Sequence, residues 1–129
     1  MEAIEKLRLL EPAAQDEPAE DVDMLGRPNR SPRAPRDLKD CISYATLPNG
    51  RRVPMLKTLV SSACEMDCRY CAFRAARDTR RATFTSDELA ALSYRLWQRG
   101  GVKGVFLSSG LLGGGVHTQD KIIATAELL

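Results

Sequence analysis

Two short apolar runs in this chain have the length and composition of buried strands. Met55 to Val60 is the first, and it follows Leu47 to Gly50, where an Asn-Gly pair tolerates the positive φ of a tight turn. Gly104 to Ser108 is the second, and it stops at Ser109-Gly110. Because both apolar runs are bounded by turn residues, they predict two core strands.

Apolar residues at helical spacing follow each run. Thr85 and Glu88 have the spacing of a capping box, with the threonine as N-cap and the glutamate three positions later. They predict a helix that ends at Gly100-Gly101. A second helix is predicted over Thr118 to Leu129, after a glycine-rich loop from Leu111 to Val116. The residues expected to face the core from the first helix are Leu89, Leu92, Leu96 and Trp97.

The predicted order is strand, cysteine loop, helix, strand, glycine loop and helix, which is a βαβα unit whose parallel strands need a crossover. We therefore expect an α/β fold. A lone parallel pair has exposed edges and little core, so further strands are expected beyond the last residue. With 129 residues the chain has room for one modest domain, and we expect it to be the truncated front part of a larger one.

Residues 1–40 differ in composition from the rest. Charged residues alternate with Leu and Ile at helical spacing from Met1 to Leu10, which predicts a short helix. Acidic residues dominate up to Asp23 and basic residues follow, although the net charge of the chain is only +2. Prolines interrupt any longer element before Leu38 at positions Pro12, Pro18, Pro28, Pro32 and Pro35. We expect a flexible, irregular leader over residues 1–40 and a folded core over residues 41–129.

The sequence predicts a cytoplasmic protein without membrane association. No apolar run approaches the roughly 18 residues that span a bilayer, and the acidic N-terminus lacks the basic and apolar regions of a secretory signal. In the cytoplasm, four cysteines with three of them clustered are expected to hold a metal rather than to form disulfides.

The clustered cysteines are Cys64, Cys68 and Cys71, directly after the first predicted strand. Their CxxxCxxC spacing puts three thiolates on one short loop. Three thiolates can bind three corners of a cubane 4Fe-4S cluster and leave the fourth iron without a protein ligand. An open iron is where a substrate or cofactor can coordinate.

This spacing, with Tyr70 as the aromatic residue before the last cysteine, resembles the hallmark of the radical S-adenosylmethionine (SAM) superfamily. The resemblance implies that the three cysteines ligate a 4Fe-4S cluster whose open iron chelates SAM. It implies the N-terminal part of a (β/α)6 partial TIM barrel. An electron passed from the cluster, which a donor of the flavodoxin or ferredoxin type would reduce, would cleave SAM to a 5′-deoxyadenosyl radical that abstracts hydrogen from substrate.

The same resemblance assigns residues to SAM. Tyr70 would lie beside the adenine, and the end of the second strand would receive the SAM amino group. This chain has Ser108, Ser109 and Gly110 there, where the superfamily often has Gly-Gly-Glu. Hydroxyls and backbone carbonyls can accept from an ammonium group. No side chain is assigned as a catalytic acid, base or nucleophile.

A closer resemblance covers about residues 38–129 and is to radical SAM proteins assigned to DNA modification or repair. It rests on Leu56-Lys57, the cysteine loop, Arg81 to Thr85 and Phe106 to Gly110. Proteins of that kind carry the rest of the barrel and a helix-hairpin-helix region further along. The resemblance implies DNA or a nucleotide as the substrate of the whole enzyme.

Two alternatives to this hypothesis stay open. The cysteines could hold a structural zinc ion, with Cys41 or His117 as fourth ligand, in a nucleic-acid-binding module without catalysis. The chain could also be inactive without the later strands. We favour Cys41 as a small, partly buried hydrophobic residue and His117 as a surface or capping residue.

The basic run after the cysteines also allows two interpretations. Its arginines could contact phosphates of a nucleic acid, or they could form a solvated stretch that bonds to carbonyl groups at a helix end. The sequence does not decide between them. The run consists of Arg74, Arg77, Arg80 and Arg81. Gly113 to Gly115 lacks the spacing of a phosphate loop, so a plain turn is expected there.

Overall fold

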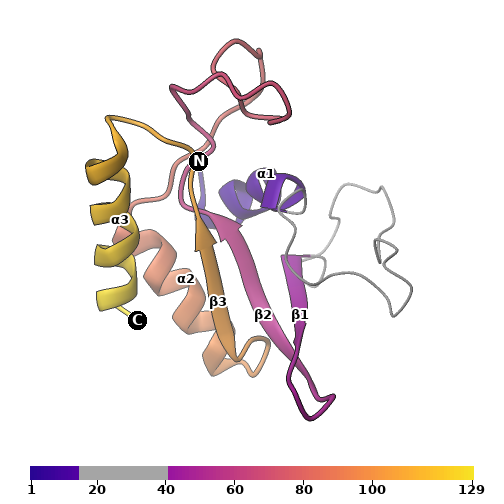
Figure 1. The fold of residues 1–129 in the computed structure, drawn as a ribbon. Coiled ribbons are helices and arrows are strands. Elements are labelled where there is room, and N and C mark those ends of the chain that lie inside the picture. Colours follow the sequence, from indigo (N-terminus) through magenta and orange to yellow (C-terminus); the bar gives the residue numbers. More distant parts are fainter. Residues whose placement is uncertain (15–40) are drawn as a thin grey trace.

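The computed structural model describes residues 1–14 and 41–129. Over these residues it contains a three-stranded sheet in the order β1-β2-β3 with three helices packed around it (Figure 1). The predicted mixed α/β class is confirmed. The elements are α1 (Ala3–Ala14), β1 (Ile42–Thr46), β2 (Arg52–Leu59), α2 (Ser86–Gln98), β3 (Gly104–Ser108) and α3 (Gly115–Glu127).

β2 and β3 pair in parallel, with Leu56 opposite Val105 and Leu59 opposite Ser108. α2 lies between them in the sequence, so the predicted βαβα order is confirmed. Because parallel strands end at the same edge of a sheet, the segments that follow β2 and β3 leave the sheet together, at its upper end in Figure 1. This arrangement brings the cysteine loop and the glycine loop to one place.

β1 is a strand that the sequence did not predict. It pairs antiparallel with β2, with Ile42 opposite Leu56. The predicted turn joins the two strands as a hairpin: Gly50 has φ 79°, and its N–H donates to the carbonyl of Leu47 at 2.9 Å. β1 was missed because it is short and half exposed, so it lacks the continuous apolar run of a buried strand.

α1 runs to Ala14, past the expected end near Leu10, and it contacts β2 and α2. Leu7 and Leu10 are completely buried and belong to the same core cluster as Leu56. Lys6 of α1 also reaches Glu88 of α2, with 2.6 Å between Nζ and Oε2. The first helix is therefore part of the folded body. Residues 15–40, for which an irregular leader is predicted, lie outside the described residues.

The capping box of α2 is present as predicted. The Thr85 hydroxyl accepts from the Glu88 N–H at 3.2 Å, and the Glu88 carboxylate accepts from the Thr85 N–H at 3.0 Å. Leu89 and Leu92 are buried, but Trp97 is 53% exposed, so its predicted core position is wrong. Trp97 stacks instead against Tyr94 near the end of the helix, with 5.7 Å between ring centroids.

No helix of the two described stretches is both long enough and apolar enough to cross a membrane.

Replacing Leu7 with alanine should lower the free energy of unfolding by about 2–5 kcal/mol, because it leaves a cavity under a completely buried side chain. Ile4→Ala on the same helix is the matched control, since Ile4 is 40% exposed and should change stability by less than about 1 kcal/mol. Urea unfolding followed by circular dichroism measures both. Equally small effects would show that α1 does not dock on the sheet.

The pair between α1 and α2 should make stability depend on pH. The hydrogen bond from Lys6, followed by the one from the Thr85 N–H, holds the pKa of Glu88 below its ordinary value of 4.5. A carboxyl group with a lowered folded-state pKa stabilises the fold above its unfolded-state pKa, and this contribution disappears as pH falls through the folded-state pKa. The partly exposed pair should contribute no more than about 1 kcal/mol.

Glu88→Gln should therefore reduce the midpoint of thermal unfolding near neutral pH, and its difference from wild type should shrink from about pH 6 to about pH 3. Glu127→Gln, far from Lys6 in the sequence and at the end of α3, serves as a charge-matched control. A Glu88→Gln effect of the same size at every pH would contradict the role of ionisation.

Candidate metal centre

The cysteine loop, residues 63–81, leaves the sheet after β2 and returns just before α2 on a paired stem. Backbone hydrogen bonds join Val60 with Phe84 at 2.8 Å and Ser62 with Ala82 at 3.0 Å. Each stem residue on one side thus has a partner on the other. The two ends of the loop are fixed next to each other, at the carboxyl end of β2.

The three predicted cysteines line one cavity of about 300 Å³. Tyr70, Ser109 and Gly110, which the sequence assigned to SAM, line it as well. Two segments about 40 residues apart in the sequence therefore meet at this cavity because β2 and β3 are parallel. Ser108 is not among the lining residues, and its buried hydroxyl has no hydrogen-bond partner among the described residues.

The three cysteines are partly buried, and none of them forms a disulfide. The backbone N–H groups of Met66 and Phe73 donate to the sulfurs of Cys64 and Cys71, each at 3.4 Å. Hydrogen bonds to the ligating sulfurs are a recurring feature of iron-sulfur sites. The thiols are not drawn to one point, however: over residues 1–14 and 41–129 no group of three or more His, Cys, Asp or Glu side chains could hold a metal ion.

Gly110 lets the segment after β3 touch the cysteine loop. Its N–H donates to the carbonyl of Ser61 at 2.7 Å. A Cβ atom at this position would lie 2.5 Å from the carbonyl oxygen of Ala63 and 3.1 Å from the Cβ of Cys64. Any side chain at position 110 would therefore push the two walls of the cavity apart.

Glu65, which the sequence analysis did not single out, ties the cysteine loop to α3. Its N–H donates to the carbonyl of Leu111 at 2.7 Å, and its carboxylate accepts from the N–H of Gly114 at 2.9 Å. Gly114 is the N-cap of α3 and has no side chain with which to cap the helix. A carboxylate at a helix N-terminus is favoured by the helix dipole, so Glu65 supplies the missing cap from another loop.

The arginine run separates into different environments. Arg81 is partly buried and donates to the carbonyl oxygens of three residues of the cysteine loop and of Ser62 in the stem. Arg77 and Arg80 are exposed, while Arg74 lies 3.8 Å from a carboxylate oxygen of Asp67. Of the two interpretations of the run, carbonyl bonding holds for Arg81, although the carbonyls belong to the cysteine loop and its stem rather than to a helix end.

The two candidates for a fourth zinc ligand do not line the cavity. Cys41 is 2% exposed and packs in the hydrophobic core at the start of β1, as a small hydrophobic residue would. His117 is in the first turn of α3, where its ring lies against Gly113. Neither residue lines the cysteine cavity.

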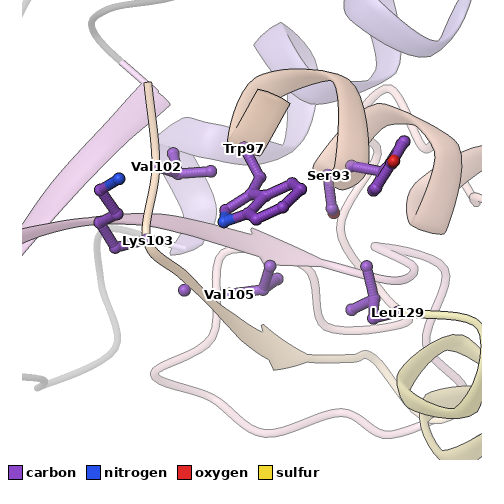
Figure 2. Close-up of a pocket in the computed structure, with 8 residues that line it drawn as sticks. Ser93, Trp97, Val102, Lys103, Val105 and Leu129 are labelled. Carbon is purple, nitrogen blue, oxygen red and sulfur yellow. The ribbon is translucent and has the colours of Figure 1, made fainter. Parts of the chain in front are cut away.

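A second cavity, of about 410 Å³, lies between the end of α2, the start of β3 and the last residue of the chain (Figure 2). Trp97 is at its centre in the view, with Val102, Val105 and Leu129 around it. Its lining contains no cysteine, histidine or carboxylate side chain. The cysteine cavity is therefore the better candidate for chemistry.

Comparison of the chain with protein-family models, with curated proteins and with solved structures finds no match. The functional assignment consequently depends on the residues and geometry described above.

Gly110→Ala should destabilise the protein by about 1–3 kcal/mol, because the added methyl group meets backbone that can move only with the loop. It should also raise the rate at which iodoacetamide alkylates Cys64. Gly115→Ala is the control: its Cβ would lie 3.7 Å from a Leu111 methyl group, an ordinary contact at the start of a helix. Unchanged alkylation of Cys64 in Gly110→Ala would show that the close approach is unimportant.

Proposed function

We propose that this chain is the front part of a radical SAM enzyme and that Cys64, Cys68 and Cys71 ligate a 4Fe-4S cluster. One observation carries the proposal: the three thiols of the CxxxCxxC segment line a single cavity, together with residues from the end of the next parallel strand. When bound, the cluster and SAM would supply one-electron cleavage of SAM to a 5′-deoxyadenosyl radical.

The donor set fits a cubane cluster. Three soft sulfur ligands on one loop match three of its irons, and N–H groups of Met66 and Phe73 already point at two of the sulfurs. Binding would have to draw the thiols together, as expected where ligation and local folding are coupled. The loop allows such a movement because its ligand-bearing residues Cys64 to Cys71 contain no helix or strand.

The cavity also has features that suit SAM. Tyr70 is 94% exposed at the cavity, so its ring is available to stack on an adenine. The glutamate of the superfamily would correspond to Gly110, where the contact with Ala63 leaves no space for a side chain. The SAM amino group would instead meet backbone carbonyls and the hydroxyl of Ser109, which donates to the carbonyl of Gly110 at 2.8 Å.

The partial (β/α)6 barrel is the proposed fold of the whole domain. The order β2-α2-β3-α3 with a parallel strand pair supports it, as does the position of the cysteine loop directly after β2. Among the described residues, β3 is paired on one side only, which leaves its other edge for a further parallel strand. The preceding hairpin strand β1 would then be an addition to the barrel pattern.

We also propose the partners that this function requires. A cytoplasmic reductant of the flavodoxin or ferredoxin type would deliver the electron, and DNA or a nucleotide is the proposed substrate of the complete enzyme. The alternative of a zinc-stabilised binding module is less well supported, because neither Cys41 nor His117 lines the cysteine cavity.

Anaerobic reconstitution with iron and sulfide, followed by electron paramagnetic resonance of the reduced protein, tests the proposal. We expect a cubane signal that shifts when SAM is added. Cys68→Ala should abolish cluster binding, while Cys41→Ala should retain it at wild-type iron content. Equal loss of iron in both variants would contradict the ligand assignment, and stoichiometric zinc without a cluster would favour the binding module.

A further inference from the structure

We propose that Arg81 is a positioning residue that holds the cysteine loop in shape from the inside, so that the three thiols face one cavity. The statement about the cluster rests on the proposed function above. The statement about the loop concerns contacts within the chain and can be tested without any cluster.

The guanidinium group of Arg81 joins the two sides of the cysteine loop. It donates to the carbonyl of Ser62, ahead of the cysteines, at 2.7 Å. It also donates to carbonyls that follow the cysteines: to Phe73, and to Arg74 and Arg77 at 2.8 Å each. Arginine is suited to this position because its planar group presents five N–H donors in a fixed fork.

These bonds take the place of secondary structure in the loop. The loop between the stem strands has no helix or strand of its own, so the carbonyl groups of its residues need other donors. One charged side chain supplies donors to three of these carbonyls and to that of Ser62 in the stem, and hydrogen bonds from a charged donor are stronger than neutral ones. The Phe73 ring adds to this contact, with its centroid 5.7 Å from the guanidinium carbon.

Arg81 acts on the thiols through residues next to them. Phe73, whose carbonyl accepts from Arg81, donates its own N–H to the sulfur of Cys71 at 3.4 Å. Ser62 lies two positions before Cys64, and its carbonyl is held on the other side of the same guanidinium group. The orientation of the first and last thiols therefore depends on one side chain that lies outside the CxxxCxxC segment.

Arg80 provides a matched control in the adjacent position. It is exposed and belongs to a shallow surface pocket with Glu5, Arg8 and Leu9 of α1. Arg80→Met and Arg81→Met remove the same charge one residue apart. Arg81→Lys keeps the positive charge but loses the planar set of N–H donors. This variant therefore separates the effect of hydrogen-bond geometry from the effect of charge.

The first experiment measures amide hydrogen exchange and cysteine alkylation in the protein without a cluster. In Arg81→Met and Arg81→Lys, amide hydrogen exchange over residues 63–77 should become about tenfold faster, because the guanidinium hydrogen bonds no longer oppose local opening of the loop. Alkylation of Cys64, Cys68 and Cys71 should become faster by about the same factor. Exchange in β2 and α2 should remain at wild-type rates, as should all rates in Arg80→Met. Wild-type loop exchange in both Arg81 variants would overturn the proposal, and so would equal acceleration throughout the chain, which would indicate general destabilisation.

The second experiment measures iron loss and the paramagnetic spectrum of the protein after reconstitution with iron and sulfide. Loss of iron to a chelator should be about 10–100-fold faster in both Arg81 variants than in wild type or Arg80→Met, and the residual cluster should show an altered paramagnetic spectrum. Wild-type iron retention and spectra in the Arg81 variants would overturn the positioning role. If the wild-type chain itself binds no cluster, the proposed function fails, and the loop-exchange result alone decides the role of Arg81.

Discussion

The parallel pairing of β2 with β3 governs the position of every candidate functional residue. Parallel strands require a crossover, which α2 provides, and their carboxyl ends lie side by side at one edge of the sheet. The cysteines follow one of these ends, and Ser109 and Gly110 follow the other. An antiparallel partner would have sent the second segment to the opposite edge, and no shared cavity would exist.

The sequence predicted the parts of the fold that carry strong local signals. The capping box of Thr85 and Glu88 and the Asn-Gly turn depend on neighbouring residues, and both form as expected. β1 was missed because a half-exposed strand of five residues carries little apolar signal, and its partner strand decides its conformation. Trp97 follows the helical period of the buried leucines, yet it lines the open cavity between the end of α2 and the start of β3, and its side chain remains half exposed.

The residues of the candidate site likewise divide into those that the sequence indicates and those that only the folded structure shows. The spacing of the three cysteines is visible in the sequence, because ligands on one loop need no tertiary contact to be recognised. The partners of Glu65 and Arg81 could not be identified from the sequence, because they are backbone groups that only the folded chain brings within reach: the N-cap of α3 for Glu65, and both sides of the cysteine loop for Arg81. The dense arginine run was a signal for basic chemistry, but only packing shows which arginine turns inward.

The paired stem beneath the cysteine loop separates the sheet from the segment that carries the three cysteine thiols. Val60 to Ser62 pair with Ala82 to Phe84, and the hydroxyls of Ser61 and Thr83 lie 2.7 Å apart across this stem. The chain thus leaves the stem and returns to it at the same point before entering α2, so the length and sequence of the intervening segment impose little on the register of β2 and β3.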